Sequence, residues 1–296
     1  MQRGREYLEK AVALDPLYAP ALLELGGYYI SMGHRGGAPP RDQWPKVREL
    51  AAKALEADPE FADAHAALGL MSALCDFGWE DSIRELDGAL QLNPDCTLAH
   101  FWRSHVLFAS GSGEAALTAI GRAVELDPLL PLFHTYGAIY FLLLGQPEQA
   151  LESARRALEV DPDFPPARLM MGEACSRLGR HEEGADLIEK TLAGVPAGYF
   201  YSALLAWVYV RAGRREAAEC LRATLEETAK HQYVPAGTRA FLALALEDLE
   251  PALTLLEESV RERDPNIPIW IGSQYFEALH GSPRFDQILR SMNLRR

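Results

Sequence analysis

Small and apolar residues recur along the chain at fixed distances from a glycine. After Gly111, an alanine, an isoleucine, an alanine and a proline follow at positions 5, 9, 12 and 17. After Gly145, three alanines and a proline occupy the same four positions. Spacings of three and four residues put side chains on one face of an α-helix, and proline disfavours continuation of that helix. The pattern therefore predicts a helix after each glycine that ends before each proline.

This pattern returns every 34 residues. The register holds over four units, at Gly111, Gly145, Gly179 and Gly213 and at Pro94, Pro128, Pro162 and Pro196. Another apolar helix precedes the glycine of each unit, and near the N-terminus it carries Leu25, Gly26 and Tyr29. A helix–turn–helix unit of 34 residues with these small positions resembles the tetratricopeptide repeat, or TPR. The resemblance implies an all-α fold, an α-solenoid in which about six and a half repeats form a right-handed superhelix.

The register treats residues 1–296 as a single solenoid. It predicts a half repeat at 1–16, repeats at 17–59, 60–94, 95–128, 129–162, 163–196, 197–230 and 233–265, and a C-terminal helical cap at 266–296. The small positions are kept less strictly after residue 196, and Arg222 stands where an apolar residue is expected. Two short helices, at 267–278 and 283–294, are expected to close the C-terminal end.

Residues 32–45 interrupt the period. The interval from Pro16 to Pro59 is 43 residues, nine more than 34, and the segment between the two helices is rich in glycine and proline. Both residue types disfavour helix, so the insertion predicts a loop between the two helices of one repeat. We expect Trp44 to fold back from this loop onto the solenoid.

The half repeat at 1–16 lacks its first helix. Its apolar side chains, among them Leu8, Ala11 and Val12, do not form the polar outer face that usually caps a solenoid. We therefore expect the natural protein to continue upstream of Met1. An upstream domain of the same polypeptide, or a second copy in a homodimer, would cover this face.

Three stretches extend the resemblance to one bacterial subset of TPR proteins. They are residues 36–69, which include the glycine- and proline-rich insertion, residues 76–94, which begin with Asp76-Phe77-Gly78-Trp79, and residues 282–294. They are similar to TPR modules attached downstream of bacterial Ser/Thr kinases, nucleotide cyclases and winged-helix regulators. This resemblance implies an interaction or regulatory module without chemistry. The Asp-Phe-Gly triplet is not a kinase metal-binding motif, because no glycine-rich loop or catalytic loop accompanies it.

Composition excludes several classes of partner. The formal net charge is −13 and the isoelectric point is about 5.1, which argues against nucleic acid as a partner. No apolar run, including residues 139–144, approaches the ~20 residues that a membrane span needs. Four scattered cysteines form no CxxC pair, so we expect reduced thiols, no zinc site and a cytoplasmic location.

The concave surface of the superhelix is the expected site for a protein or peptide partner. Counted from each closing proline, positions 7, 11 and 14 of the first helix are predicted to face the groove. The partner-binding candidates there are Phe101, His105, Phe108, Ile139, Glu173 and Trp207. A tight superhelix would instead bury some of them, so that Phe101 or Trp207 would belong to the core between repeats.

Two other functions stay open. The repeats could be purely structural and hold a neighbouring domain or a second copy without binding a free ligand. A small-molecule sensor or an enzyme would use the histidine and aromatic cluster of His100, Phe101, Trp102, His105, Phe108, His134 and Tyr136. A spacing of five residues between His100 and His105 is poor for two metal ligands on one helix. We therefore expect no catalytic residue, no metal site and no cofactor.

Overall fold

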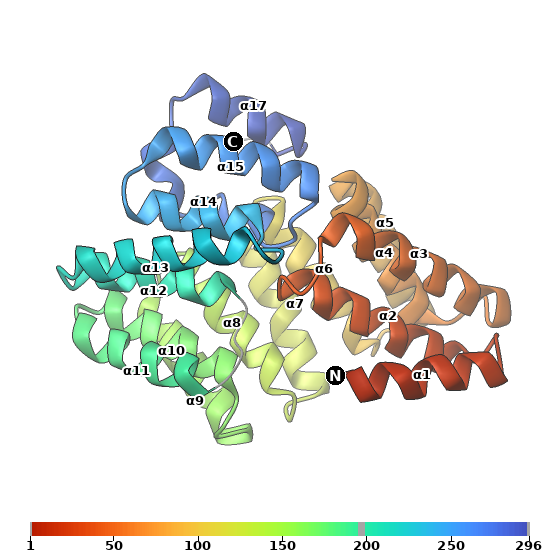
Figure 1. Ribbon diagram of the computed structural model, residues 1–296. Helices are drawn as coiled ribbons and strands as arrows, with labels where there is room; N and C mark the ends of the chain where they lie inside the picture. The colour runs from red at the N-terminus through yellow and green to blue at the C-terminus, as the bar shows by residue number, and fades with distance from the viewer. Residues whose placement is uncertain (1, 195–198, 295–296) are drawn as a thin grey trace.

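The computed structural model describes residues 2–194 and 199–294, and every regular element in these ranges is helical. The elements are α1 (Gln2–Leu14), α2 (Ala19–His34), α3 (Pro40–Ala57), α4 (Ala62–Asp76), α5 (Trp79–Leu92), α6 (Thr97–Ala109), α7 (Gly113–Leu126), α8 (Pro131–Leu143), α9 (Pro147–Val160), α10 (Pro165–Arg177), α11 (His181–Gly194), α12 (Tyr199–Arg211), α13 (Arg215–Ala229), α14 (Ala236–Ala245), α15 (Leu249–Glu262), α16 (Ile267–Trp270), the 3₁₀ helix η1 (Gln274–Leu279) and α17 (Pro283–Ser291). The all-α solenoid expected from the period is confirmed (Figure 1). Met1, the predicted boundary at residues 196 and 197, and the last two residues of the cap lie outside the described ranges.

Helices pair in the order that the period predicts. The even-numbered helices α2 to α14 are the first helices of the repeats, and each packs against the helix that follows it. The turn glycines Gly111, Gly145, Gly179 and Gly213 have φ values of 92°, 73°, 81° and 73°, which L side chains rarely adopt. These glycines therefore end the first helices and turn the chain into the second ones.

Close approach of two helices explains why a glycine occupies position 172 on a first helix. A Cβ atom added at Gly172 of α10 would lie 2.6 Å from Cγ1 of Ile188 and 2.9 Å from the carbonyl oxygen of Gly184, both on α11. Neither gap accommodates a methyl group without movement of the backbone. Glycine here lets the two helices of one repeat touch.

The insertion forms less loop than expected. Helix α2 continues to His34 and α3 begins at Pro40, so residues 35–39 alone are non-helical. Proline fits the first turn of a helix, where its missing N–H has no partner in any case, so Pro40 starts α3 rather than preventing it. The prediction of a loop over residues 32–45 was therefore wrong in extent. The extra residues lengthen two helices.

Trp44 folds inward, as expected, but from a helix. Its side chain is 1% exposed, and Gly33 of α2 leaves the space that its ring fills. Its indole Nε1 donates a hydrogen bond to the carbonyl oxygen of Arg263, at 3.0 Å. The insertion thus connects the first repeat to the C-terminal segment.

The C-terminal segment does not simply cap the far end of the solenoid. After α15, near the end of the chain marked in Figure 1, the C-terminal segment meets the N-terminal repeats, since α15 contacts α3 and α16 contacts α6. Trp79 Nε1 donates to the carbonyl oxygen of Met292 at 2.8 Å, and Asn293 Nδ2 donates to that of Phe77 at 3.1 Å. The predicted helix at 267–278 is the short α16 followed by η1. The superhelix therefore closes on itself through its own C-terminus.

One large hydrophobic core follows from this closure. It extends from Trp44 to Leu294 and includes side chains from nearly every helix, while a smaller cluster around Leu22 and Leu25 lies between α1, α2 and α3. The four cysteines are unpaired thiols. Within residues 2–194 and 199–294, no helix is long and apolar enough to cross a bilayer.

Candidate binding cavity

The concave surface is divided into a filled half and an open half. The filled half lies toward the C-terminal ends of the first helices, where η1 and the residues around it occupy the groove. The open half lies toward the N-terminal ends of α6, α8, α10 and α12 and the C-terminal half of α2, and it forms a cavity of about 650 Å³. Of the six partner-binding candidates, Phe101 and Ile139 line the cavity, whereas His105, Phe108, Glu173 and Trp207 do not.

Tyr275 of η1 is the centre of the filled half. Its side chain is buried, and its hydroxyl donates a hydrogen bond to the carboxylate of Glu173, which is 0% exposed. Arg211 contacts the same carboxylate at 2.8 Å and Arg177 at 3.0 Å, and the guanidinium of Arg177 lies 4.6 Å from the centre of the Tyr275 ring. Glu173 therefore anchors this chain's own C-terminal segment.

Electrostatics support that anchor. Burial by itself would lower the pKa of Arg211, but the Glu173 carboxylate outweighs burial and raises that pKa. Burial raises the pKa of Tyr275, and the negative charge of Glu173 raises it further. The tyrosine is thus a neutral donor, and Arg211 stays charged at any ordinary pH.

The other covered candidates also have structural partners. Trp207 packs edge-on against Tyr275, with ring centres 4.9 Å apart, and its Nε1 donates to the carbonyl oxygen of Phe241 at 3.0 Å. Phe108 stacks on Tyr140 at 4.6 Å. These contacts bury Trp207 in part, and Phe101, at 3% exposure, is the candidate that the tight-superhelix alternative describes most closely.

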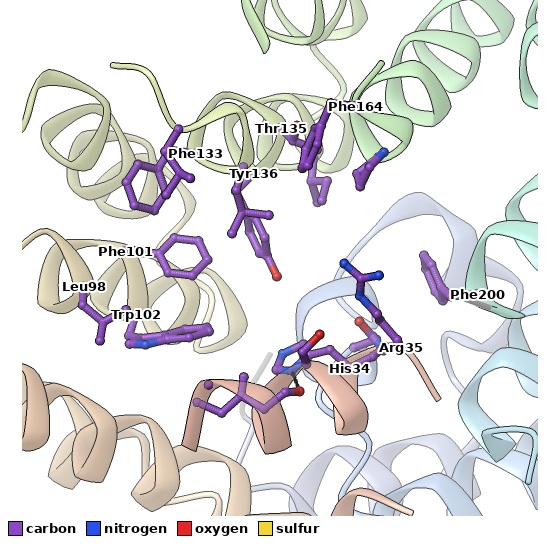
Figure 2. Close-up of a pocket in the computed structure, with 18 of the residues that line it drawn as sticks. His34, Arg35, Leu98, Phe101, Trp102, Phe133, Thr135, Tyr136, Phe164 and Phe200 are labelled. Atoms are coloured by element: carbon purple, nitrogen blue, oxygen red, sulfur yellow. Dashed lines mark hydrogen bonds between the residues drawn. The ribbon is translucent and has the colours of Figure 1, made fainter. Parts of the chain in front are cut away.

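Aromatic side chains form much of the wall of the open half. They project from the first helices and from α16 into one space (Figure 2). Phe101 is the best packed, since its ring centre lies 5.1 Å from that of Phe133 and 4.8 Å from that of Tyr136. Phe200 and Trp270 lie across the cavity, 4.9 Å apart. Two packed walls on different repeats hold the space open.

Few polar groups line this cavity, and none of its lining residues is acidic. Figure 2 shows the guanidinium of Arg35 directed into the space, from the end of α2. Arg35 forms no ion pair with any acid in the described part of the chain. The hydroxyl of Tyr201 lines the same side and makes no hydrogen bond to another described residue. The cavity therefore combines apolar walls with one free positive charge.

A polar and aromatic cluster adjoins the cavity. The ring of His34 lies 6.3 Å from that of Trp102 and 5.9 Å from that of His105. His34 Nδ1 donates to the carbonyl oxygen of Ile30 at 3.0 Å, which leaves Nε2 as an acceptor without a partner among the described residues. Trp102 Nε1 and both ring nitrogens of His105 also lack partners there.

Both cluster histidines are neutral at physiological pH. Burial lowers the pKa of His34 to about 4. Burial and the nearby His34 ring lower the pKa of His105 to about 3. General acid–base catalysis at neutral pH needs a pKa near 7, and neither ring has one.

The structure separates the other histidines of the predicted cluster from the cavity. His100 Nε2 lies 2.9 Å from the carbonyl oxygen of Pro94, and His134 Nε2 lies 3.2 Å from that of Pro128. His65 makes the equivalent contact with Pro59, and Arg168 takes the same place in the next repeat by donating to Pro162. These residues stand six positions after a closing proline and fix the turn between repeats. In the described ranges, no three His, Cys, Asp or Glu side chains are placed to hold a metal ion.

Comparison with known families identifies the repeat. Two models of the tetratricopeptide repeat match the chain, one at residues 78–131 and the other at 141–199. The chain is a TPR protein. Kinase and cyclase relatives do not appear among these findings, and a search of curated proteins gives no match.

Solved structures show the same fold for the TPR protein. A tetratricopeptide repeat protein from Parabacteroides merdae is 14% identical, with a TM-score of 0.56, over 93% of this chain and 98% of that one. PilF from Pseudomonas aeruginosa is 19% identical, with a TM-score of 0.53, over 77% of this chain and 95% of that one. A chain of the Cut9–Hcn1 hetero-tetramer of APC/C is 15% identical, with a TM-score of 0.65, over 97% of this chain and 52% of that one. At these identities the likeness extends to the fold alone.

Proposed function

We propose that this TPR protein is a protein–protein interaction module whose partner binds at the open half of the concave surface. The observation that carries the proposal is the cavity of about 650 Å³, which is walled by aromatic side chains and is not filled by η1. Large exposed apolar surfaces on a folded protein typically mark a partner site. Phe101 and Ile139 remain partner-binding residues in this proposal.

An apolar rim beside the cavity gives the partner a place to dock. Leu129 and Leu130, in the turn between α7 and α8, are 76% and 37% exposed. Pro165 and Pro166 begin α10 at the next turn and line the same side of the cavity. A segment of the partner would lie across this rim and direct an apolar side chain inward. Anchors that fill a pocket commonly supply most of the energy of such contacts.

The module's place in the cell is a separate part of the proposal. Resemblance of the Asp76–Trp79 segment and of the chain's end to bacterial TPR modules supports a regulatory role within a larger cytoplasmic signalling protein. The partner would then be a protein or peptide, or an upstream domain of the same polypeptide. Binding, rather than catalysis, is the role that the cavity fits.

Self-association is a second candidate, because one feature of α1 favours it. Leu8 and Val12, proposed from the sequence as a dimer surface, pack against the cluster of α2 instead. Tyr7 and Leu14 are 67% and 88% exposed and form the apolar outer face of α1. Light scattering distinguishes the candidates: self-association through α1 predicts a dimer that Tyr7→Glu converts to a monomer. A chain that is monomeric at all concentrations removes this candidate.

A peptide selection tests the interaction proposal. Random peptides displayed on phage are selected on the wild-type chain, and individual clones are then measured by fluorescence polarisation. We expect selected peptides to bind the Leu129→Asp variant at least about tenfold more weakly, because a carboxylate on the rim opposes apolar contact. Leu249→Asp, on a partly exposed leucine at the start of α15, is the matched control. Equal binding to both variants, or no selected peptide, would contradict the proposal.

A further inference from the structure

We propose that the interior of the cavity is a binding site for a small organic carboxylate with an aromatic or aliphatic body, and that Arg35 pairs with the carboxylate. This site goes beyond the interaction function, because its occupant lies inside the cavity while the protein partner lies across the rim. Nothing in the repeat pattern calls for such a ligand. The proposal stands on the cavity's size, its walls and its charge.

The size of the cavity suits a small molecule. Pockets of roughly 300–1,000 Å³ bury most of a drug-sized ligand, and this cavity, at about 650 Å³, lies within that range. Trp270 and Asn266 of the C-terminal segment line it and cover part of the concave surface. A compact ligand with an apolar body fits this space.

The walls select an apolar body for the ligand. Rings from α6 and α8 form one side, with Phe101, Phe133 and Tyr136, and Phe200 and Trp270 form another (Figure 2). Because these rings already pack on one another, they keep their positions without a ligand. A flat ring or a short alkyl chain would contact aromatic faces and edges and displace weakly held water.

Charge selects a carboxylate for the polar end. The chain has 42 Asp and Glu against 29 Lys and Arg, yet the residues that line the cavity include Arg35 and no acid. A guanidinium offers two parallel N–H donors that match a carboxylate. The hydroxyl of Tyr201 is close enough for the charge of Arg35 to affect it, and it supplies a further donor. A phosphate dianion would require more positive charge than one arginine provides.

Helix α2 offers a substitution that fills the cavity without disturbing the fold. A Cβ atom added at Gly27, which lines the cavity, meets no other atom within 4 Å. Gly27→Leu therefore places an isobutyl group in the open space and also replaces a helical glycine by a better helix former. Gly88 of α5 is equally unobstructed but does not line the cavity, so Gly88→Leu is the matched control.

Isothermal titration calorimetry with three related probes tests the proposal on the full chain. The probes are 4-phenylbutanoate, its neutral amide and 4-phenylbutylamine. We expect the carboxylate to bind with a dissociation constant below 1 mM, the amide at least about tenfold more weakly, and the amine not at all, because ion pairing with Arg35 contributes about that factor. Quenching of tryptophan fluorescence should accompany carboxylate binding, because Trp102 and Trp270 line the site.

The variants locate the binding. Arg35→Gln should abolish the preference for carboxylate over amide, Gly27→Leu should abolish binding of both, and Gly88→Leu should bind as wild type does. The proposal is overturned if the carboxylate does not bind, if carboxylate and amide bind equally to wild type, or if Gly27→Leu still binds. Leu129→Asp should retain carboxylate binding, so failure of the ligand site and failure of the partner site give different results.

Discussion

Inward-facing positions of the repeats are buried in one half of the concave surface and line a cavity in the other half. In the filled half, Glu173 has Tyr275, Arg177 and Arg211 as partners, and its charge is fully compensated. In the open half, Arg35 points into an empty space and has no described acid as a partner. The difference depends on one covering segment. Where η1 reaches the first helices, their inward side chains become core, and elsewhere these side chains line a cavity together with Asn266 and Trp270.

Removal of the buried carboxylate of Glu173 is expected to lower the free energy of unfolding more than any other change considered. Glu173→Ala leaves two mostly buried guanidinium groups without their counterion. Loss of one member of a buried ion pair typically costs about 3 to 5 kcal/mol of unfolding free energy. Urea unfolding measures the change. The control Glu152→Ala breaks an exposed pair with Arg156 and should remain close to wild type. Similar stability of both variants would contradict the anchoring role.

Loss of a contact that closes the superhelix is expected to have the second-largest effect on stability. Trp79→Phe keeps an aromatic ring but removes the N–H that donates to the carbonyl oxygen of Met292. We expect a loss of about 1 to 3 kcal/mol, because a buried acceptor is left unpaired. Hydrogen exchange should accelerate in α17 more than in α10. Unchanged exchange in α17 would show that this bond does not hold the C-terminal segment.

Two glycines on first helices should respond to alanine in opposite directions. Gly27→Ala faces the open cavity and should raise stability by up to about 1 kcal/mol, because alanine favours helix. Gly172→Ala places a methyl group against the backbone of Gly184 and should lower stability. Thermal melts compare the two variants. A loss of stability for Gly27→Ala would mean that the space beside α2 is not open.

Substitution of His105 should change the free energy of unfolding least at neutral pH and more in acid. In the folded chain its pKa is about 3, below the ordinary value of 6.5, so unfolded chains bind more protons between these values. Stability from the neutral ring is therefore lost as pH falls below 6.5. His105→Leu removes this dependence, and its unfolding free energy should be near wild type at pH 7 and should exceed it increasingly toward pH 4. Parallel pH curves for the two proteins would exclude burial of a neutral ring.

Local signals made the repeats predictable. Turn glycines and closing prolines act within one helix pair, so the period of 34 and the all-α fold follow from the sequence. The same reasoning failed for residues 32–45, because it took proline as a breaker where Pro40 starts a helix. Arg35 was consequently assigned to a long loop and was not considered as a groove residue.

Contacts between distant residues made the candidate site unpredictable. The bonds of Trp44 to Arg263 and of Trp79 to Met292 join residues 219 and 213 positions apart, and no periodicity within repeats indicates them. Position 7 of each repeat predicts Phe101 as a groove residue; its side chain lines the cavity but is only 3% exposed. The same spacing predicts Glu173 and Trp207 as partner contacts, because nothing in the repeat pattern indicates that Tyr275 packs against both.

Hydrogen exchange of the C-terminal segment tests the central claim most directly. If residues 264–279 fill half of the concave surface, their amide groups should exchange as slowly as those of α8 and α10, and Glu173→Ala should release them first. Mass spectrometry of peptides from the intact chain resolves these regions. Exchange of residues 264–279 within seconds in the wild-type chain would contradict the account, because the groove would then be open along its whole length.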